Sequence, residues 1–133
     1  MRAFLDTNVL VAAFATRGLC ADVLRVVLAE HQLMTGEVVL AELRAVLLRR
    51  IKLPLATVED IVALLRDQEV VPKPRKPSDM PIRDPDDRWI LASATAGRAD
   101  VLVTGDRDLL DVAGKAPLPI LAPRGFWDLL SKA

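Results

Sequence analysis

The sequence predicts a three-layer α/β/α fold, with a short, mostly parallel central sheet between two layers of helices. Short apolar segments typical of buried strands alternate along the chain with longer segments that carry apolar residues at helical spacing. The chain has 133 residues, 52% of them hydrophobic, so we expect a single domain over residues 1–133 with a well-packed core. Ligands of such a sheet are expected at the carboxyl ends of its strands.

Five segments have the composition of strands. They are residues 2–5, 32–34, 69–71, 101–103 and 119–121, the last at an edge of the sheet. Helices are expected at residues 9–14, 19–30, 37–50, 57–66, 85–96 and 107–112, and from residue 124 onward. Asp84 before Pro85 is the clearest helix start, because an N-cap side chain precedes a proline at the first helical position.

Two helix starts are predicted from weaker signals. Thr35 is expected to open the helix at 37–50, which is apolar almost all round and therefore predicts a buried element. Thr57, with Asp60 three residues later, has the spacing of a capping pair for the next helix.

The composition excludes several classes of protein. The longest apolar run, residues 9–15, is far shorter than the roughly 20 residues needed to cross a bilayer, and the start of the chain is unlike a secretory signal peptide. We therefore expect a cytoplasmic protein without a membrane segment. Cys20 and His31 are the only residues of their types, so they cannot form a zinc site, and any metal must bind to oxygen ligands.

The formal net charge is zero, with 18 basic and 18 acidic residues, so the totals do not indicate a nucleic-acid-binding protein. The distribution of charge is more informative. If five of the acids lined one cleft, the rest of the protein would carry a net charge of +5. A positive surface around the cleft would suit a polyanionic substrate. The five are Asp6, Glu42, Asp84, Asp87 and Asp106.

Asp6 and Asp106 each follow a short apolar strand, so in a parallel sheet both carboxylates emerge at the same edge. Taken singly, each is more simply explained as the cap of the following helix. Glu42 is more informative, because its neighbours three and four positions away are apolar and an unpaired carboxylate there needs a metal, a cation or a cleft. Asp87 shares a helical face with Ile90 and Leu91, which indicates the entrance of a cleft.

Carboxylates that converge without histidine or cysteine repel one another, and they become stable together by protonation or by binding a hard cation. Mg²⁺ or Mn²⁺ is the expected ion, because it takes oxygen ligands and leaves positions for water and phosphate oxygens. The expected reaction is hydrolysis of a phosphodiester bond.

The pattern made by residues 4–8, Glu42 in a helix, residues 84–87 and residues 104–106 resembles that of PIN-domain proteins over nearly the whole chain. Residues 83–94 and 102–110 are similar to the VapC-like group, the toxins of toxin–antitoxin pairs. This resemblance implies a PIN-like fold and a Mg²⁺-dependent ribonuclease whose acidic set is Asp6, Glu42, Asp87 and Asp106.

Within that set, the resemblance implies that Asp6 and Asp87 or Asp106 bind the metal directly. Asn8 and Thr104 would orient the acids by hydrogen bonds, and Asp84 and Asp108 are secondary candidates. It also implies a homodimer and a partner antitoxin that covers the acidic cleft, often with an inserted arginine.

Basic residues could form two rims that contact the phosphates of RNA, and Arg44, Arg83 and Arg88 are the first candidates. One rim would consist of Arg44, Arg49, Arg50 and Lys52, and the other of Lys73, Arg75, Lys76, Arg83 and Arg88. For any one of them, a solvated surface is the simpler interpretation. Three other functions stay open: a receiver-like or phosphatase-like Mg²⁺ domain, a catalytically silent module that binds RNA or protein, and a structural domain with acidic helix caps. The first usually needs a lysine at a strand end, and the last explains Glu42 worst.

Overall fold

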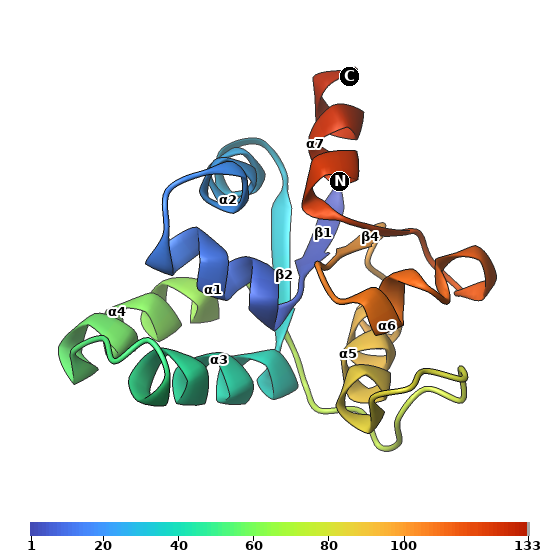
Figure 1. Ribbon diagram of the computed structural model, residues 1–133, viewed down its shortest axis with the longest axis horizontal. Coiled ribbons are helices and arrows are strands. Elements are labelled where there is room, and N and C mark those ends of the chain that lie inside the picture. The colour runs from blue at the N-terminus through green and yellow to red at the C-terminus, as the bar shows by residue number, and fades with distance from the viewer. Residues whose placement is uncertain (133) are drawn as a thin grey trace.

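The computed structural model, drawn in Figure 1, describes residues 1–132. Five parallel strands form one sheet in the order β3-β2-β1-β4-β5. The strands are β1 (Arg2–Leu5), β2 (Gln32–Gly36), β3 (Glu69–Val71), β4 (Val101–Val103) and β5 (Ile120–Leu121). Because β1 pairs with both β2 and β4, the strand order reverses beside it. A crevice at the carboxyl ends of β1 and β4 is the expected ligand site of this topology.

Helices cover both faces of the sheet, which confirms the predicted three-layer arrangement (Figure 1). They are α1 (Thr7–Ala15), α2 (Leu19–Glu30), α3 (Glu37–Arg49), α4 (Leu55–Arg66), α5 (Pro85–Ala96), α6 (Arg107–Leu110), α7 (Pro123–Ser131) and the 3₁₀ turn η1 (Ala113–Lys115). Right-handed crossovers place α1 to α4 on one face and α5 with α6 on the other. None of the helices within residues 1–132 has both the length and the apolar composition needed to span a membrane.

The central strands are apolar on both sides, as parallel strands covered by two layers of helices must be. Ala3, Phe4 and Leu5 of β1 are completely buried, and so are Leu33 and Met34 of β2. A continuous core on each face of the sheet therefore fixes the positions of the strand ends, from which the polar side chains emerge.

Two predicted helix starts are wrong. Thr35 does not open a helix but lies within β2, where it pairs with Val70 of β3, and Gly36 is the N-cap of α3. Thr57 does not cap α4, which begins at Leu55 after Pro54 and has no capping side chain. Val58 N already donates to the carbonyl of Pro54 at 3.1 Å, so Thr57 lies inside the first turn of α4 and cannot be its cap.

The third helix is also less buried than its apolar composition predicts. Only one stripe of α3 is buried, consisting of Val39, Leu40, Leu43 and Leu47. Glu42 is exposed on another side of the helix. The reason is that α3 packs against α1, α4, α5 and β2 without being enclosed by them, so part of its surface borders a cleft.

At the amino ends of the strands, Arg2 ties three elements together. Its guanidinium donates to Glu69 of β3 in a two-point ion pair and to the carbonyl of Gly97, which follows α5, at 2.7 Å. Gly97 is close to the sheet, because a Cβ atom there would lie 2.5 Å from Val71 Cγ2 and 2.6 Å from Met34 Cε. The C-terminal end of α5 therefore needs glycine at this position.

We expect Gly97→Ala to lower the free energy of unfolding by about 1–3 kcal/mol, because Val71 is β-branched and cannot move aside without a backbone shift. Gly125→Ala is the matched control, since a Cβ atom there meets nothing within 4 Å and alanine favours α7 by about 0.5–1 kcal/mol. Urea denaturation measures both. Equal stability of the two variants would contradict the close contact.

Candidate active site

Asp6 follows β1 directly, and its position is fixed by several hydrogen bonds. Its backbone N–H donates to the carbonyl of Val103 at 2.9 Å, which continues the pairing of β1 with β4. Its side chain is buried and accepts from Thr7 N at 2.7 Å, from Thr104 Oγ1 at 2.8 Å and from Asn8 Nδ2 at 3.2 Å. Asp6 thus caps α1 and also faces the crevice, so the two interpretations of this residue are compatible.

The turn after β4 completes the network. Thr104 Oγ1 accepts a hydrogen bond from Asp106 N at 2.9 Å, and Asn8 Oδ1 accepts from Gly105 N at 2.9 Å. The ends of β1 and β4 are therefore linked through side chains as well as through the sheet. The hydrogen bonds expected between Asp6 and the side chains of Asn8 and Thr104 are present, and a functional role for them stays a prediction.

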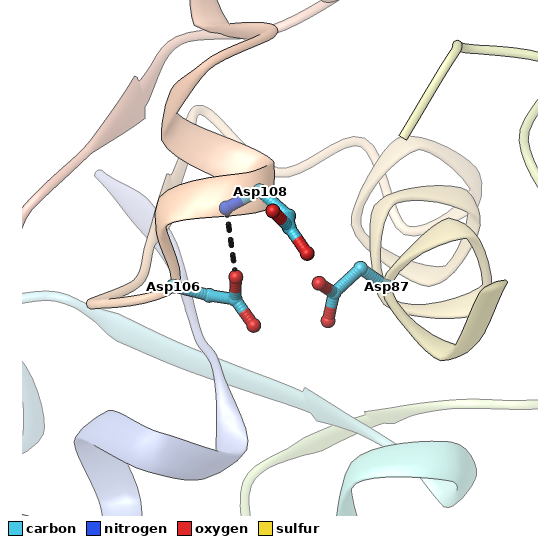
Figure 2. A group of neighbouring side chains, drawn as sticks. All are labelled: Asp87, Asp106 and Asp108. Carbon is cyan, nitrogen blue, oxygen red and sulfur yellow. Dashed lines mark hydrogen bonds between the residues drawn. The ribbon is translucent and has the colours of Figure 1, made fainter. Parts of the chain in front are cut away.

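Asp87, in the first turn of α5, brings a third element to the site. Carboxylate oxygens of Asp87, Asp106 and Asp108 all lie within 4.8 Å of one another, and Figure 2 shows the three side chains pointing toward one another. Asp106 also caps α6 by accepting from Asp108 N at 2.9 Å. Asp87 is only 7% exposed, and its Oδ2 has no hydrogen-bond partner within residues 1–132.

Burial and like charge raise the pKa values of these acids. For Asp87, desolvation is the largest cause, and the hydrogen bond and the charge of Asp106 come next. The charges of Asp6 and Asp84 add to these effects, and together they raise the pKa of Asp87 to about 8. Desolvation also raises the pKa of Asp6, against the opposing effect of its hydrogen bonds from Thr104 and Thr7. The site therefore holds more negative charge than it can stabilise without a cation or a proton.

A cleft of about 490 Å³ opens beside these acids, between α1 and α3. Among its lining residues are Asp6, Glu42, Asp87 and Asp106, so the structure brings the four predicted acids together. Glu42 is exposed to the cleft and has no ion pair within residues 1–132. Desolvation and the charge of Asp6 still raise its pKa, while the hydroxyl of Thr7 opposes that shift.

Of the other predicted residues, Asn8 lines the cleft, whereas Asp84 and the three arginines do not. Asp84 caps α5 by accepting from Asp86 N at 2.9 Å, although its charge still affects Asp87 and Glu42. Arg44 is paired with Glu59 of α4 at 2.5 Å. Arg83 is exposed, and Arg88 donates to the carbonyl of Ile82 at 3.1 Å.

Arg50 is the basic residue that lines the cleft, and it belongs to one of the two basic rims expected from the sequence. Its spacing points to the same place, because it stands eight positions after Glu42 with Val46 midway, on one helical face. A larger cavity, of about 700 Å³, lies between residues 74–81 and α5, but Asp79 is the only acid that lines it. It is therefore a poorer candidate for metal chemistry than the acidic cleft.

We expect Asp87→Asn to stabilise the metal-free protein, by about 1–3 kcal/mol at pH 8. A folded pKa raised above the unfolded value gives stability that is present at low pH and lost as the pH rises through the folded pKa, here about 8. The advantage of the variant should therefore grow between pH 5 and pH 8 in denaturation experiments with chelator. Asp128→Asn, on the exposed face of α7, is the control, and the same pH dependence for both variants would contradict the argument.

Thr104→Val should weaken Mn²⁺ binding about 10–100-fold, because it removes the hydroxyl that orients Asp6 and accepts from Asp106 N. The folded protein should also lose about 1–3 kcal/mol of stability, since buried polar groups are left without partners. The control is Thr95→Val, which removes an exposed hydroxyl that bonds only within α5, to Leu91. Unchanged Mn²⁺ affinity in Thr104→Val would contradict an orienting role.

Comparison with known proteins agrees with this architecture. The family model described as PIN domain matches residues 2–108. Similar solved structures include VapBC2 from Rickettsia felis bound to a promoter DNA fragment (TM-score 0.64, 19% identity, 92% of this chain and 98% of the other). Two further structures have a TM-score of 0.63 and 19% identity to this chain. VapBC-1 from nontypeable Haemophilus influenzae is matched over 93% of this chain and 99% of its own. A toxin–antitoxin complex from Klebsiella pneumoniae is matched over 91% of this chain and 97% of its own.

No curated protein matches the sequence significantly. The structural likenesses, at less than a quarter identity, concern the fold alone, whereas the family match extends over most of the chain. It includes Asp6, Glu42, Asp87 and Asp106, the four acids that line the cleft. The chain belongs to the PIN-domain family.

Proposed function

We propose that this protein is a Mg²⁺- or Mn²⁺-dependent endoribonuclease that hydrolyses RNA phosphodiester bonds in the acidic cleft, and that it is the VapC-like toxin of a toxin–antitoxin pair. The observation that carries the proposal is the buried carboxylate of Asp87. It has an unpartnered oxygen and faces Asp106 and Asp108, in a cleft that also holds Asp6 and Glu42.

The donor set fits a hard divalent cation. Its ligands are carboxylate oxygens, and neither Cys20 nor His31 lines the cleft, so a zinc or other soft-metal site is disfavoured. Asp87 and Asp106 would hold the ion, with Asp108 or Asp6 as a further ligand. The unpartnered oxygen of Asp87 would gain a partner in the cation, and the repulsion that raises its pKa would be relieved.

The residues of the chain have separable tasks in this reaction. A bound divalent cation supplies charge neutralisation at the phosphate and lowers the pKa of water. Asn8 and Thr104 hold Asp6 in one orientation, and the turn after β4 holds Asp106 in a fixed relation to it. Glu42 is exposed to the cleft and has a raised pKa, and it would accept a proton from the attacking water.

The toxin role is supported by the kind of assembly in which similar folds are found. The structures from Rickettsia felis and Haemophilus influenzae are VapBC proteins, and the one from Klebsiella pneumoniae is called a toxin–antitoxin complex. We infer that this chain has an antitoxin partner that covers the cleft, and that it forms a homodimer. A small DNA-binding protein encoded by the neighbouring gene would support this part of the proposal.

The rival enzyme function is less well supported by the site. A receiver-like or phosphatase-like centre needs a lysine near the phosphate, and no lysine lines the acidic cleft. A module that only binds RNA or protein has no need for several unpaired acids around one cavity. A purely structural role accounts for the caps made by Asp6, Asp84 and Asp106 but not for Asp87, which caps nothing and whose buried Oδ2 has no partner within residues 1–132.

Cleavage of a mixed structured RNA by the purified protein tests the proposal. Mg²⁺ or Mn²⁺ should support cleavage, chelator should abolish it, and Asp6→Asn should reduce it by at least about 100-fold. Asp128→Asn, far from the cleft on α7, should leave it unchanged. If wild type and Asp6→Asn are equally inactive and calorimetry detects no Mg²⁺ or Mn²⁺ binding, the nuclease function is wrong and a binding or structural role replaces it.

A further inference from the structure

The cavity of about 700 Å³ between residues 74–81 and α5 shares no lining residue with the acidic cleft. One wall is made by α5 and includes Ala92 and Ala96. Ala96 follows Asp87 by nine positions, which corresponds to about 13 Å along the helix and about half a turn around it. The cavity therefore lies on the side of α5 opposite to the acids, and a ligand there is not part of the metal site.

The cavity is positively charged. Arg75 and Lys76 line it from the segment before α5, and Lys115 lines it from η1. All three are exposed and have no ion pair within residues 1–132. Asp79 is the one acid in the lining, so three positive charges and one negative charge give a net charge of +2. Cations from two elements are therefore available to an external anion.

The rest of the lining is mostly apolar. It includes Met80, the alanines of α5 and four prolines, which are Pro74, Pro77, Pro81 and Pro117. Proline has no backbone N–H, so this part of the lining cannot donate hydrogen bonds from the backbone. The cavity thus offers a ligand cationic side chains and apolar surface.

The segment that forms the other wall is long and held in place. Residues 72–84 connect β3 to α5 without a helix or strand of their own (Figure 1), and connections longer than about 12 residues are uncommon and usually functional when ordered. Ser78 N donates to the carbonyl of Arg88 at 3.0 Å. Met80 N donates to Ser78 Oγ at 3.2 Å, and Ile82 N donates to the carbonyl of Met80 at 2.8 Å. These bonds and the fixed φ of the prolines form the cavity before a ligand binds.

We propose that this cavity binds a nucleoside polyphosphate, with its phosphates at Arg75, Lys76 and Lys115 and its base against the apolar lining. The site is separate from the proposed nuclease function and needs no metal ion in the acidic cleft. Its volume of about 700 Å³ lies within the range of roughly 300–1,000 Å³ that is typical of small-molecule sites. Such sites combine an apolar lining with a few charged groups, as this one does.

Charge and chemistry both favour this occupant. A chain of phosphates gathers several negative charges in one short group, which suits three cations around one cavity. The flat face of a base suits the apolar surface of the prolines and alanines. An acidic protein segment in an extended conformation is the alternative occupant. Its backbone carbonyls would need donors, and the prolines of the lining supply none.

Calorimetry of ATP and GTP binding to the full chain, with chelator present, tests the proposal. Chelator removes any metal ion from the acidic cleft, which then repels a polyanion, so binding reports on the basic cavity. At least one of the two nucleotides should bind. Inorganic triphosphate and adenosine should each bind at least about tenfold more weakly than that nucleotide, because each occupies only one part of the site.

Two variants with matched controls locate the bound nucleotide. Lys115→Gln should weaken binding about tenfold by loss of a charge-assisted contact. Lys132→Gln, the same change at an exposed lysine outside the cavity, should alter it by less than about twofold. Ala96→Leu should weaken binding by about tenfold because leucine fills part of the cavity. Ala56→Leu, at an exposed position of α4, is the control for this change.

Three results would overturn the proposal. The first is that neither nucleotide binds, or that inorganic triphosphate binds as tightly as ATP and GTP. The second is equal nucleotide binding by Lys115→Gln and Lys132→Gln. The third is that a hexaglutamate peptide or a single-stranded RNA binds more tightly than either nucleotide and loses affinity in Lys115→Gln, which assigns the cavity to protein or to RNA. Nucleotide binding is measured without a divalent cation and the proposed RNA cleavage requires one, so the two proposals can fail separately.

Discussion

The carboxylate of Asp6 accepts hydrogen bonds from Thr7, Asn8 and Thr104, and the rest of the site depends on this junction. It lies where the strand order of the parallel sheet reverses, so that β1 and β4 are adjacent although almost a hundred residues separate them in the sequence. The same threonine hydroxyl accepts from the backbone of Asp106. One buried acid thus sets the relative positions of α1, the turn after β4 and the acids on either side.

The site gathers like charges at a cost to the stability of the metal-free chain. Capping bonds partly stabilise Asp6 and Asp106, but Asp87 has no such support for its Oδ2, and its pKa is raised to about 8. Functional sites commonly hold groups that lower stability, because activity needs them unpaired. At the other end of the cleft, Arg50 has the opposite charge and no ion pair within residues 1–132. The cleft therefore has opposite charges at its two ends and apolar walls between them.

Much of this arrangement could be predicted from the sequence. Strands 69–71 and 101–103, the Asp84–Pro85 helix start and the convergence of the four acids follow from apolar runs and the geometry of parallel sheets. The prediction that Thr35 opens a helix is wrong, because a hydroxyl residue just before a helix has the pattern of a cap. In the structure, pairing with Val70 of β3 extends β2 through Thr35. The ion pair of Arg44 with Glu59 depends on how α3 packs against α4, a contact that local patterns do not encode.

Calorimetry of Mn²⁺ binding at pH 7, in two buffers with different heats of ionisation, tests the central claim most directly. Because the pKa of Asp87 is about 8 in the metal-free protein, its carboxyl group is mostly protonated at pH 7 and must lose its proton to bind the ion. The account predicts release of nearly one proton per bound Mn²⁺, and loss of that release in Asp87→Asn. Absence of Mn²⁺ binding, or binding with the same proton release in both proteins, would contradict it.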